Sequence, residues 1–149
     1  MPRIRAVTPD DAEQWARLRH ALWPDGSLAE HRAEAERFLA GSALEPGQVL
    51  LAVSDDGLLL GFAELSIRNI VHACTPGRVG YLEGWYVAPE ARRQGIGRAL
   101  VSAGEHWARE QGCREFASDA DLPNEVSHAA HRALGFTETG RGVTYRKDL

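Results

Sequence analysis

The segment "ARRQGIGRALV" (91–101) constrains the fold more than any other stretch of this chain. A strand-like run, "YLEGWYV" (81–87), precedes it, and a helical pattern follows. Gly95 and Gly97 would leave the backbone N–H groups of a helix start uncovered, and such groups bind anions. Three arginines add positive charge to the same segment: Arg92, Arg93 and Arg98. The sequence therefore predicts a strand–loop–helix unit that binds a phosphate-bearing ligand.

Two other nucleotide motifs share this outline. A P-loop requires Gly-Lys-Ser/Thr, but Arg98 follows Gly97, which excludes ATP hydrolysis of that type. A dinucleotide fingerprint requires a third glycine where Leu100 stands, although Glu115 lies at a suitable distance for a ribose-binding acid. A non-catalytic module that binds CoA or a dinucleotide therefore remains an alternative to an enzyme.

The whole chain, 1–149, predicts a single domain, because 149 residues suit one hydrophobic core. The order of patterns is one strand, two helices, three strands, then helix, strand, helix and strand. Strands are expected at 3–7, 49–54, 58–68, 81–87, 115–119 and 142–147. Helices are expected at 9–22, 27–41, 96–112 and 125–134. This order favours the α/β class, with a mixed, mostly antiparallel sheet flanked by helices.

Three local signals sharpen this prediction. Ser27 and Glu30 form a capping-box pattern, and Asn124 can cap the last helix. Gly84 stands inside a strand, where glycine often marks a bulge or the close approach of a ligand.

Composition excludes several classes of function. A net charge of −4 argues against broad nucleic-acid binding and favours cationic partners. No apolar run reaches the roughly 18 residues of a membrane span, and the start of the chain lacks a signal-peptide core. From these two features we expect a cytoplasmic protein. Cys74 and Cys113 are expected to be reduced. His128 and His131 lie one helical turn apart without a third ligand nearby, so no metal site is expected.

The pattern Arg92-x-x-Gly95-x-Gly97 after an apolar strand resembles the acetyl-CoA motif of the GNAT-type N-acetyltransferase superfamily. Within it, the chain is similar to the aminoglycoside 6′-N-acetyltransferases. Five segments carry this likeness, in order: "LRHALWPD", "EGWYVAPEARRQGIGRALV", "GCREFASD", "HRALGF" and the final "YRK". The resemblance covers nearly the whole chain. It implies the GNAT fold, acetyl-CoA as cofactor, and acetyl transfer to an aminoglycoside 6′-amine in a ternary complex, an antibiotic-resistance activity.

The resemblance also implies a set of cofactor-binding residues. They are Tyr86, Val87, Arg92, Arg93, Gln94, Gly95, Ile96, Gly97, Arg98 and Asn124. A homodimer that uses the C-terminal strand is implied as well. Because GNAT motifs say little about the acceptor, a peptide or protein amine or a polyamine is the alternative substrate.

Acetyl transfer to an amine requires a neutral amine. An alkylamine with a pKa near ~10 is protonated at pH 7, and deprotonating it costs roughly 4 kcal/mol, so a base or water relay is needed. Glu83, in an apolar strand, and Asp119, at the end of a neighbouring strand, are the candidate acids. By resemblance both hold ammonium groups, and Glu83 relays the proton. The alternatives are a salt-bridged structural glutamate and a loop or cap aspartate.

The departing thiolate also needs a proton. His131 stands where related enzymes often carry a tyrosine, and histidine can donate a proton, or it can simply pack. The resemblance further places Trp23 and Asp25, in "LWPD", at the acceptor, and Tyr145 can contact substrate or pack. Ile70 and Val71 replace the aromatic residue expected in close relatives, which affects the shape of the acceptor pocket.

Overall fold

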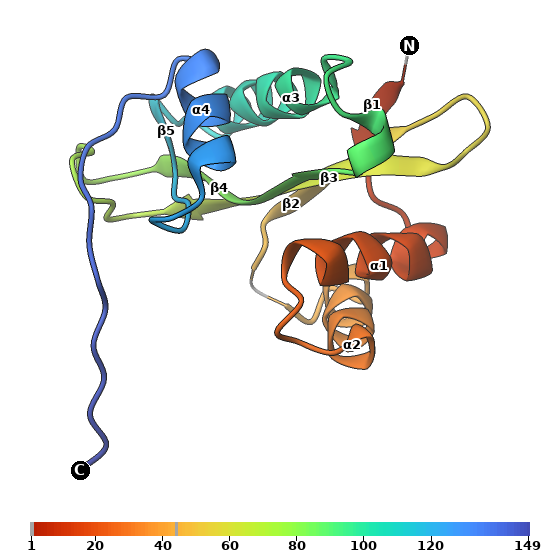
Figure 1. Ribbon diagram of the computed structural model, residues 1–149, viewed down its shortest axis with the longest axis horizontal. Helices are drawn as coiled ribbons and strands as arrows, with labels where there is room; N and C mark the ends of the chain where they lie inside the picture. The colour runs from red at the N-terminus through yellow and green to blue at the C-terminus, as the bar shows by residue number, and fades with distance from the viewer. Residues whose placement is uncertain (1, 44) are drawn as a thin grey trace.

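The computed structural model describes residues 2–43 and 45–149. In this part of the chain, five strands form one sheet in the order β1-β2-β3-β4-β5, accompanied by four α-helices (Figure 1). The strands are β1 (Arg3–Ala6), β2 (Gln48–Val53), β3 (Leu59–Arg68), β4 (Val79–Val87) and β5 (Glu115–Ser118). The helices are α1 (Ala12–Leu22), α2 (Leu28–Leu39), α3 (Ile96–Glu110) and α4 (Glu125–Ala133). Short 3-10 turns precede α1 and α3, at Pro9–Asp11 and Pro89–Ala91.

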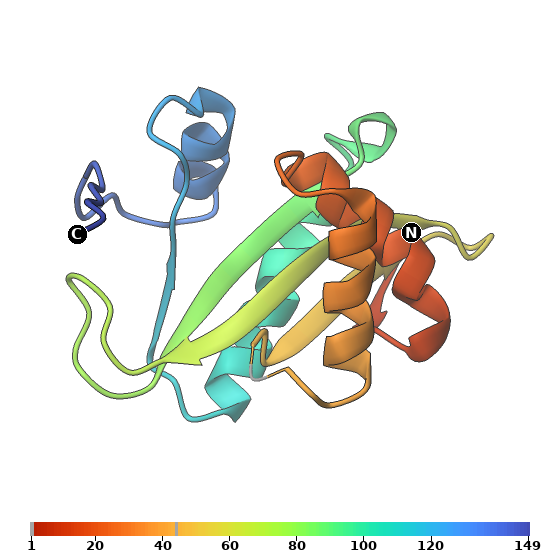
Figure 2. The same ribbon diagram turned by 90° about the horizontal axis from the view of Figure 1, so that it is seen from below.

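The sheet is mixed and mostly antiparallel, as predicted. The strands from β1 to β4 pair antiparallel with their neighbours, and only β5 runs parallel to β4. Helices α1 and α2 cover one face of the sheet, and α3 covers the other (Figures 1 and 2). The Gly95 loop leads into α3, so the residues expected to bind the acceptor can lie on the opposite face of the sheet, beneath α1 and α2.

Alternation along β3 divides the core between the two faces. Phe62 packs with Trp15 and Ala35 on the α1/α2 side, while Leu65 packs with Leu100 on the α3 side. All five side chains are completely buried. Within the described residues, none of the helices has the length and apolar character needed to cross a membrane.

The local signals expected from the sequence are present. The Glu30 N–H donates to Ser27 Oγ (3.1 Å), and the Ser27 N–H donates to the Glu30 carboxylate (3.3 Å). The Asn124 side chain accepts from the Ser127 N–H (3.1 Å), which caps α4. These contacts confirm where α2 and α4 begin.

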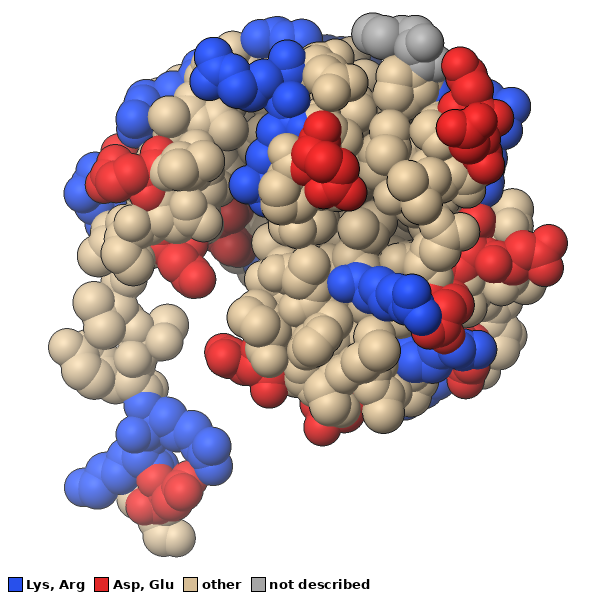
Figure 3. All heavy atoms as spheres, turned by 45° about the vertical axis from the view of Figure 1, so that its right-hand side comes forward, with Lys and Arg blue, Asp and Glu red and all other residues tan. Residues whose placement is uncertain are grey.

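The strand predicted at 142–147 does not form. Residues 137–149 have no regular secondary structure, and they lead away from the sheet to the C-terminus, so that the tail stands clear of the body (Figures 1 and 3). The tail side chains Val143 and Tyr145 are exposed. An alternating pattern indicates side chains that suit a pleated sheet. A strand forms, however, only where the edge of another strand is close enough to pair with it.

Candidate functional site

Strands β4 and β5 separate halfway along β4. Their parallel pairing runs from Val79 to Leu82, and in the described part of the chain no strand pairs with 83–87 on that side. Unpaired backbone N–H and C=O groups on such an edge can bind an extended ligand. Tyr86 and Val87, predicted to contact the cofactor, lie on this open stretch.

Glu83 lies in a β-bulge at the start of the open stretch. Glu64 of β3 pairs with Gly84, whereas Leu65 pairs with Leu82, so Glu83 is the extra residue of β4. A Cβ atom on Gly84 would lie 2.5 Å from Cη2 of Trp23. The expected bulge is therefore present, and the close neighbour of Gly84 is the indole of Trp23.

The Glu83 carboxylate is surrounded by hydrogen-bond donors. Arg68 Nε donates to Glu83 Oε2 at 3.1 Å, and Arg68 Nη2 donates to the same oxygen at 2.7 Å. The Ser66 hydroxyl donates to Oε2 at 3.1 Å. Glu83 is thus a paired carboxylate, and its role in the reaction stays a prediction.

Arg68 also links Glu83 to Asp119. Its guanidinium carbon lies 3.6 Å from the centre of the Tyr81 ring, and the Tyr81 hydroxyl donates to Asp119 Oδ2. Burial, together with the hydrogen bond to Asp119, raises the pKa of Tyr81, so its hydroxyl remains a donor. The structure therefore joins the two predicted acids through a cation and an aromatic ring.

The sequence analysis missed Arg68 and Tyr81. Neither residue belongs to a motif, and the alternation of β3 and β4 indicated only that they share strands with Ser66 and Glu83. An arginine at the end of an otherwise apolar strand was the one available signal.

A cavity of about 380 Å³ adjoins Glu83, between α1, α2 and the sheet. Its charged lining residues are Arg19, Arg37, Glu34, Glu45, Glu64 and Glu83. Four carboxylates face two guanidinium groups, so the lining carries an excess of negative charge when all are ionised. This balance suits a cationic ligand.

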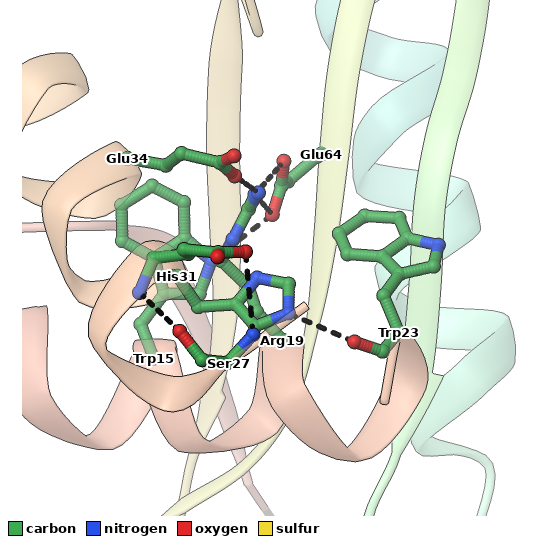
Figure 4. Close-up of polar contacts among 8 residues, drawn as sticks. Trp15, Arg19, Trp23, Ser27, His31, Glu34 and Glu64 are labelled. Carbon is green, nitrogen blue, oxygen red and sulfur yellow. Dashed lines mark hydrogen bonds and ion pairs between the residues drawn. The ribbon is translucent and has the colours of Figure 1, made fainter. Parts of the chain in front are cut away.

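Arg19 and Glu64 form a buried ion pair beside this cavity (Figure 4). Arg19 also pairs with Glu34, and Trp15 Nε1–H donates to Glu64 Oε2 at 3.2 Å. Burial raises the pKa of Glu64, while Arg19 and the Trp15 N–H act in the opposite direction. Sequence reasoning missed this pair, although a glutamate within "GFAELS" was a visible signal.

Trp23 follows the end of α1 and packs against Phe62 on the α1/α2 face of the sheet. His31 holds it: His31 Nε2 lies 2.8 Å from the Trp23 carbonyl oxygen, and the two rings stack at 6.4 Å (Figure 4). The Arg19 guanidinium carbon lies 5.0 Å from the Trp23 ring centre. Asp25 is exposed in the next turn, where among the described residues its carboxylate has no hydrogen-bond partner.

The loop before α3 has the conformation that an anion site requires. Arg93 (φ 63°) and Gly95 (φ 82°) are both left-handed. The first helical hydrogen bond here runs from the Ala99 N–H to the Gly95 carbonyl, which leaves the preceding N–H groups for a ligand. A Cβ atom on Gly95 would meet nothing within 4 Å, so the φ angle is what favours glycine. These features fit the pyrophosphate of CoA.

The arginines of this loop have structural contacts of their own. Arg92 Nε donates to the Val87 carbonyl at 2.8 Å, which ties the loop to β4. Arg98 Nη2 donates to the Ala133 carbonyl at 3.3 Å, which ties α3 to α4. Arg93 and Gln94 are exposed, and the side chain of Ile96 is buried in the core.

His131 lies where β4 and β5 separate. Its Nε2 is 2.8 Å from Ser118 Oγ, at the end of β5, and its Nδ1 is 2.7 Å from the Ser127 carbonyl oxygen. Because a carbonyl oxygen only accepts, Nδ1 carries hydrogen and Nε2 faces the strand opening. The ring packs edge-on against Trp85 at 5.4 Å.

Two other predictions concern residues outside this region. His128 Nε2 contacts the Leu122 carbonyl oxygen at 2.9 Å, so the two histidines of α4 have separate partners. Tyr145 is 93% exposed in the tail, and the structure does not bring it to the other candidate residues. Its role as a substrate contact stays a prediction.

Comparisons with known proteins agree with this geometry. Residues 15–136 match the model of the acetyltransferase (GNAT) family. An aminoglycoside N(6′)-acetyltransferase type 1 from Klebsiella aerogenes is 53% identical over 148 residues, covering 99% of this chain and 97% of the relative. One from Stenotrophomonas maltophilia is 45% identical over 154 residues, covering 99% and 94%.

Solved structures show the same likeness. The aminoglycoside N-acetyltransferase AAC(6′)-Iy in complex with CoA superposes with a TM-score of 0.90 at 37% identity, covering 100% of this chain and 96% of the other. The same enzyme in complex with the bisubstrate analogue CoA-S-monomethyl-acetylneamine gives a TM-score of 0.89 at 37% identity, covering 100% and 99%.

Proposed function

The chain belongs to the GNAT acetyltransferase family, and on this premise we propose that it transfers acetyl from acetyl-CoA to the 6′-amino group of aminoglycoside antibiotics. The similarity to named 6′-acetyltransferases along nearly the whole chain supports the reaction. The observation that carries the proposal is the junction of an open β4 edge with a carboxylate-lined cavity at Glu83. The open edge of β4 suits the cofactor, and the cavity suits a polycationic sugar.

Acetyl-CoA would supply an acetyl group activated as a thioester. The left-handed loop at Gly95 and the first turn of α3 would hold its pyrophosphate, and the open edge at Tyr86 and Val87 would hold its pantetheine arm. The other predicted cofactor-binding residues, Asn124 included, lie on the same loop or at the start of α4.

The acidic residues would bind and deprotonate the amine. Glu83 and Asp119 attract the ammonium group, and Glu83 then accepts a proton from it, directly or through water, so that the nitrogen lone pair can attack. The cavity beside Glu83 receives further ammonium groups of the antibiotic. Trp23 provides an aromatic wall for a sugar ring. His131, in the form with hydrogen on both ring nitrogens, would give the Nε2 hydrogen to the departing sulfur while Nδ1–H stays on the Ser127 carbonyl.

Thiol release from acetyl-CoA tests this proposal. The assay compares kanamycin and tobramycin with spermidine and a lysine peptide. We expect release with the two aminoglycosides only, with a single acetyl group at the 6′ nitrogen of the product. Release with only the peptide or spermidine would overturn the acceptor, and no release with any of the four would favour a binding module.

The assembly and location of the enzyme are part of the same proposal. A homodimer would give the exposed side chains of the C-terminal tail, such as Val143 and Tyr145, a surface to pack against. A cytoplasmic location agrees with the two free cysteines, Cys74 and Cys113. Light scattering during gel filtration, and fractionation of cells expressing the protein, test these two points.

A further inference from the structure

We propose that Arg68 competes with the substrate amine: its guanidinium group occupies the ammonium position at Glu83, and the ammonium group of the substrate displaces it. This inference rests on the proposed function, because it concerns the amine that the enzyme accepts. It adds a residue to which no motif of the sequence points.

The surroundings of Arg68 have the chemistry of an ammonium-binding site. A carboxylate, Glu83, accepts hydrogen bonds from Arg68 on both of its oxygens, those on Oε2 at 3.1 and 2.7 Å, and an aromatic face, Tyr81, lies 3.6 Å from the guanidinium carbon. Proteins bind organic cations with this combination of carboxylate and aromatic ring. The site is therefore complete, and the enzyme's own side chain fills it.

The cation is the movable part of this arrangement. Arg68 is the last residue of β3, its side chain is 41% exposed, and the exposed Asn69 and Ile70 follow it. The Glu83 side chain is only 19% exposed, and Tyr81 is buried with its hydroxyl bonded to Asp119. Arg68 can therefore turn toward solvent while the carboxylate and the ring stay in place.

Charge favours exchange over coexistence. Glu83, Asp119 and Arg68 together carry one net negative charge, which attracts an ammonium group to the site. An ammonium group that binds beside Arg68 nevertheless lies next to a like charge, and displacement of Arg68 removes that repulsion. Every amine that binds at Glu83 meets the same cost of displacing Arg68. A polyamine has further ammonium groups, which the carboxylates of the adjoining cavity attract, among them Glu34 and Glu45.

The contact between Arg68 and Glu83 should also limit the hydrolysis of acetyl-CoA. In the free enzyme, Glu83 Oε2 already accepts hydrogen bonds from Arg68 and Ser66. It is then not free to accept a proton from a water molecule. Acetyl-CoA hydrolysis in the absence of an amine should therefore be slow for as long as Arg68 stays in place.

The test compares Arg68→Ala and Arg68→Lys with the wild type. The substrates are kanamycin and a monoamine sugar, methyl 6-amino-6-deoxyglucoside. In Arg68→Ala we expect the KM values of kanamycin and of the monoamine to fall by similar factors, at least about tenfold, with the change in KM and not in kcat. Acetyl-CoA hydrolysis without amine should rise, and Arg68→Lys should restore both properties in part. Arg17→Ala, which removes an exposed ion-paired arginine on α1, is the control for net charge.

Two results would overturn the proposal. A higher kanamycin KM in Arg68→Ala, without a gain for the monoamine, would show that Arg68 remains in the complex and helps to bind the substrate. Unchanged KM values and unchanged hydrolysis would show that Arg68 does not compete with the amine.

Failure of the proposed function is separable from these results. If the wild type acetylates spermidine or a lysine peptide instead of kanamycin, the KM of that substrate is measured in the same Arg68 variants. NMR of arginine Nε–H groups gives a readout that does not depend on turnover. Kanamycin or spermidine should release the Arg68 signal, identified by its absence in Arg68→Lys, and a signal that stays unchanged at saturating polyamine would contradict displacement.

Discussion

The indole ring of Trp23 lies so close to the α-carbon of Gly84 that no side chain fits between them. This contact joins the turn after α1 to the bulge in β4 that contains Glu83. Three residues of the candidate acceptor site, Trp23, Glu83 and Gly84, therefore depend on a single packing arrangement.

Replacing Gly84 by alanine should push the Trp23 ring away from β4. The new methyl group would lie 2.5 Å from Trp23, so the ring must move, at a cost of about 1–3 kcal/mol in unfolding free energy. We expect the KM for the acceptor to rise at least about tenfold and CoA affinity to change little. Gly80→Ala, with a clash of 2.7 Å against Ala108 of α3, is the matched control. An equal rise in acceptor KM in both variants would contradict the role of Trp23.

Glu83→Gln tests the proton acceptor. The amide keeps the shape of the side chain but is a poor base, so turnover should fall at least about tenfold while CoA affinity remains unchanged. Steady-state kinetics and calorimetric CoA binding measure the two effects. Glu110→Gln, an exposed residue of α3, controls for loss of one negative charge. An unaffected rate would remove Glu83 from the mechanism.

Gly95→Ala tests the cofactor loop. A left-handed alanine costs about 1–2 kcal/mol, so the variant should lose stability, and its CoA dissociation constant should rise as the loop relaxes. Gly57→Ala is a matched control, because Gly57 has the same φ of 82° and equally open space but lies in the turn between β2 and β3. It should lose similar stability and bind CoA normally.

His131 variants test the proton donor. His131→Phe keeps the packing against Trp85 but cannot exchange a proton, so we expect kcat to fall about tenfold. His131→Tyr, which restores a hydroxyl, should retain more activity. His128→Gln, one turn away, should leave kcat unchanged. If His131→Phe turns over normally, water protonates the sulfur.

Asp11 should make stability depend on acid. Its carboxylate accepts from Arg5 at 2.7 and 2.9 Å, and the Arg5 hydrogen bonds, with those from Thr8, hold the pKa of Asp11 below its usual value of 3.8. The pair therefore stabilises the fold at pH values above about 4, and the contribution is lost as the pH falls through the lowered pKa.

Urea unfolding of Asp11→Asn measures this effect. The variant should lose about 1–3 kcal/mol at pH 7, and its difference from the wild type should shrink toward pH 3. Asp10→Asn, exposed in the same turn, should show no such trend. A difference that stays constant with pH would assign the loss to packing.

The fold followed from the sequence wherever a local rule decides the outcome. The Ser27–Glu30 box, the Asn124 cap and the glycine-rich loop each act within a few residues, so their patterns suffice to place α2, α4 and α3. The predicted strand at 142–147 required a distant partner edge, and no pattern within the segment reports whether one is near.

In the candidate site, too, local patterns could be predicted and contacts between strands could not. Glu83 stood out because a carboxylate in an apolar strand requires a reason. Its partner Arg68 lies on β3, and Tyr81 lies two residues before Glu83 on β4. A β-bulge sets how these residues of the two strands line up. Such contacts between strands depend on the bulge at Glu83, which shifts the register by one residue. The sequence indicated a bulge near Gly84 but not which residues the shifted register brings together.

The separation of β4 and β5 also bears on how the protein avoids self-association. Edge strands with free N–H and C=O groups are templates on which other chains add strands and aggregate. Here the open edge is short, it begins at a bulge, and α4 lies beside it through the His131–Trp85 contact. A bound donor would cover what remains, so we expect acetyl-CoA to reduce aggregation of the protein through this edge.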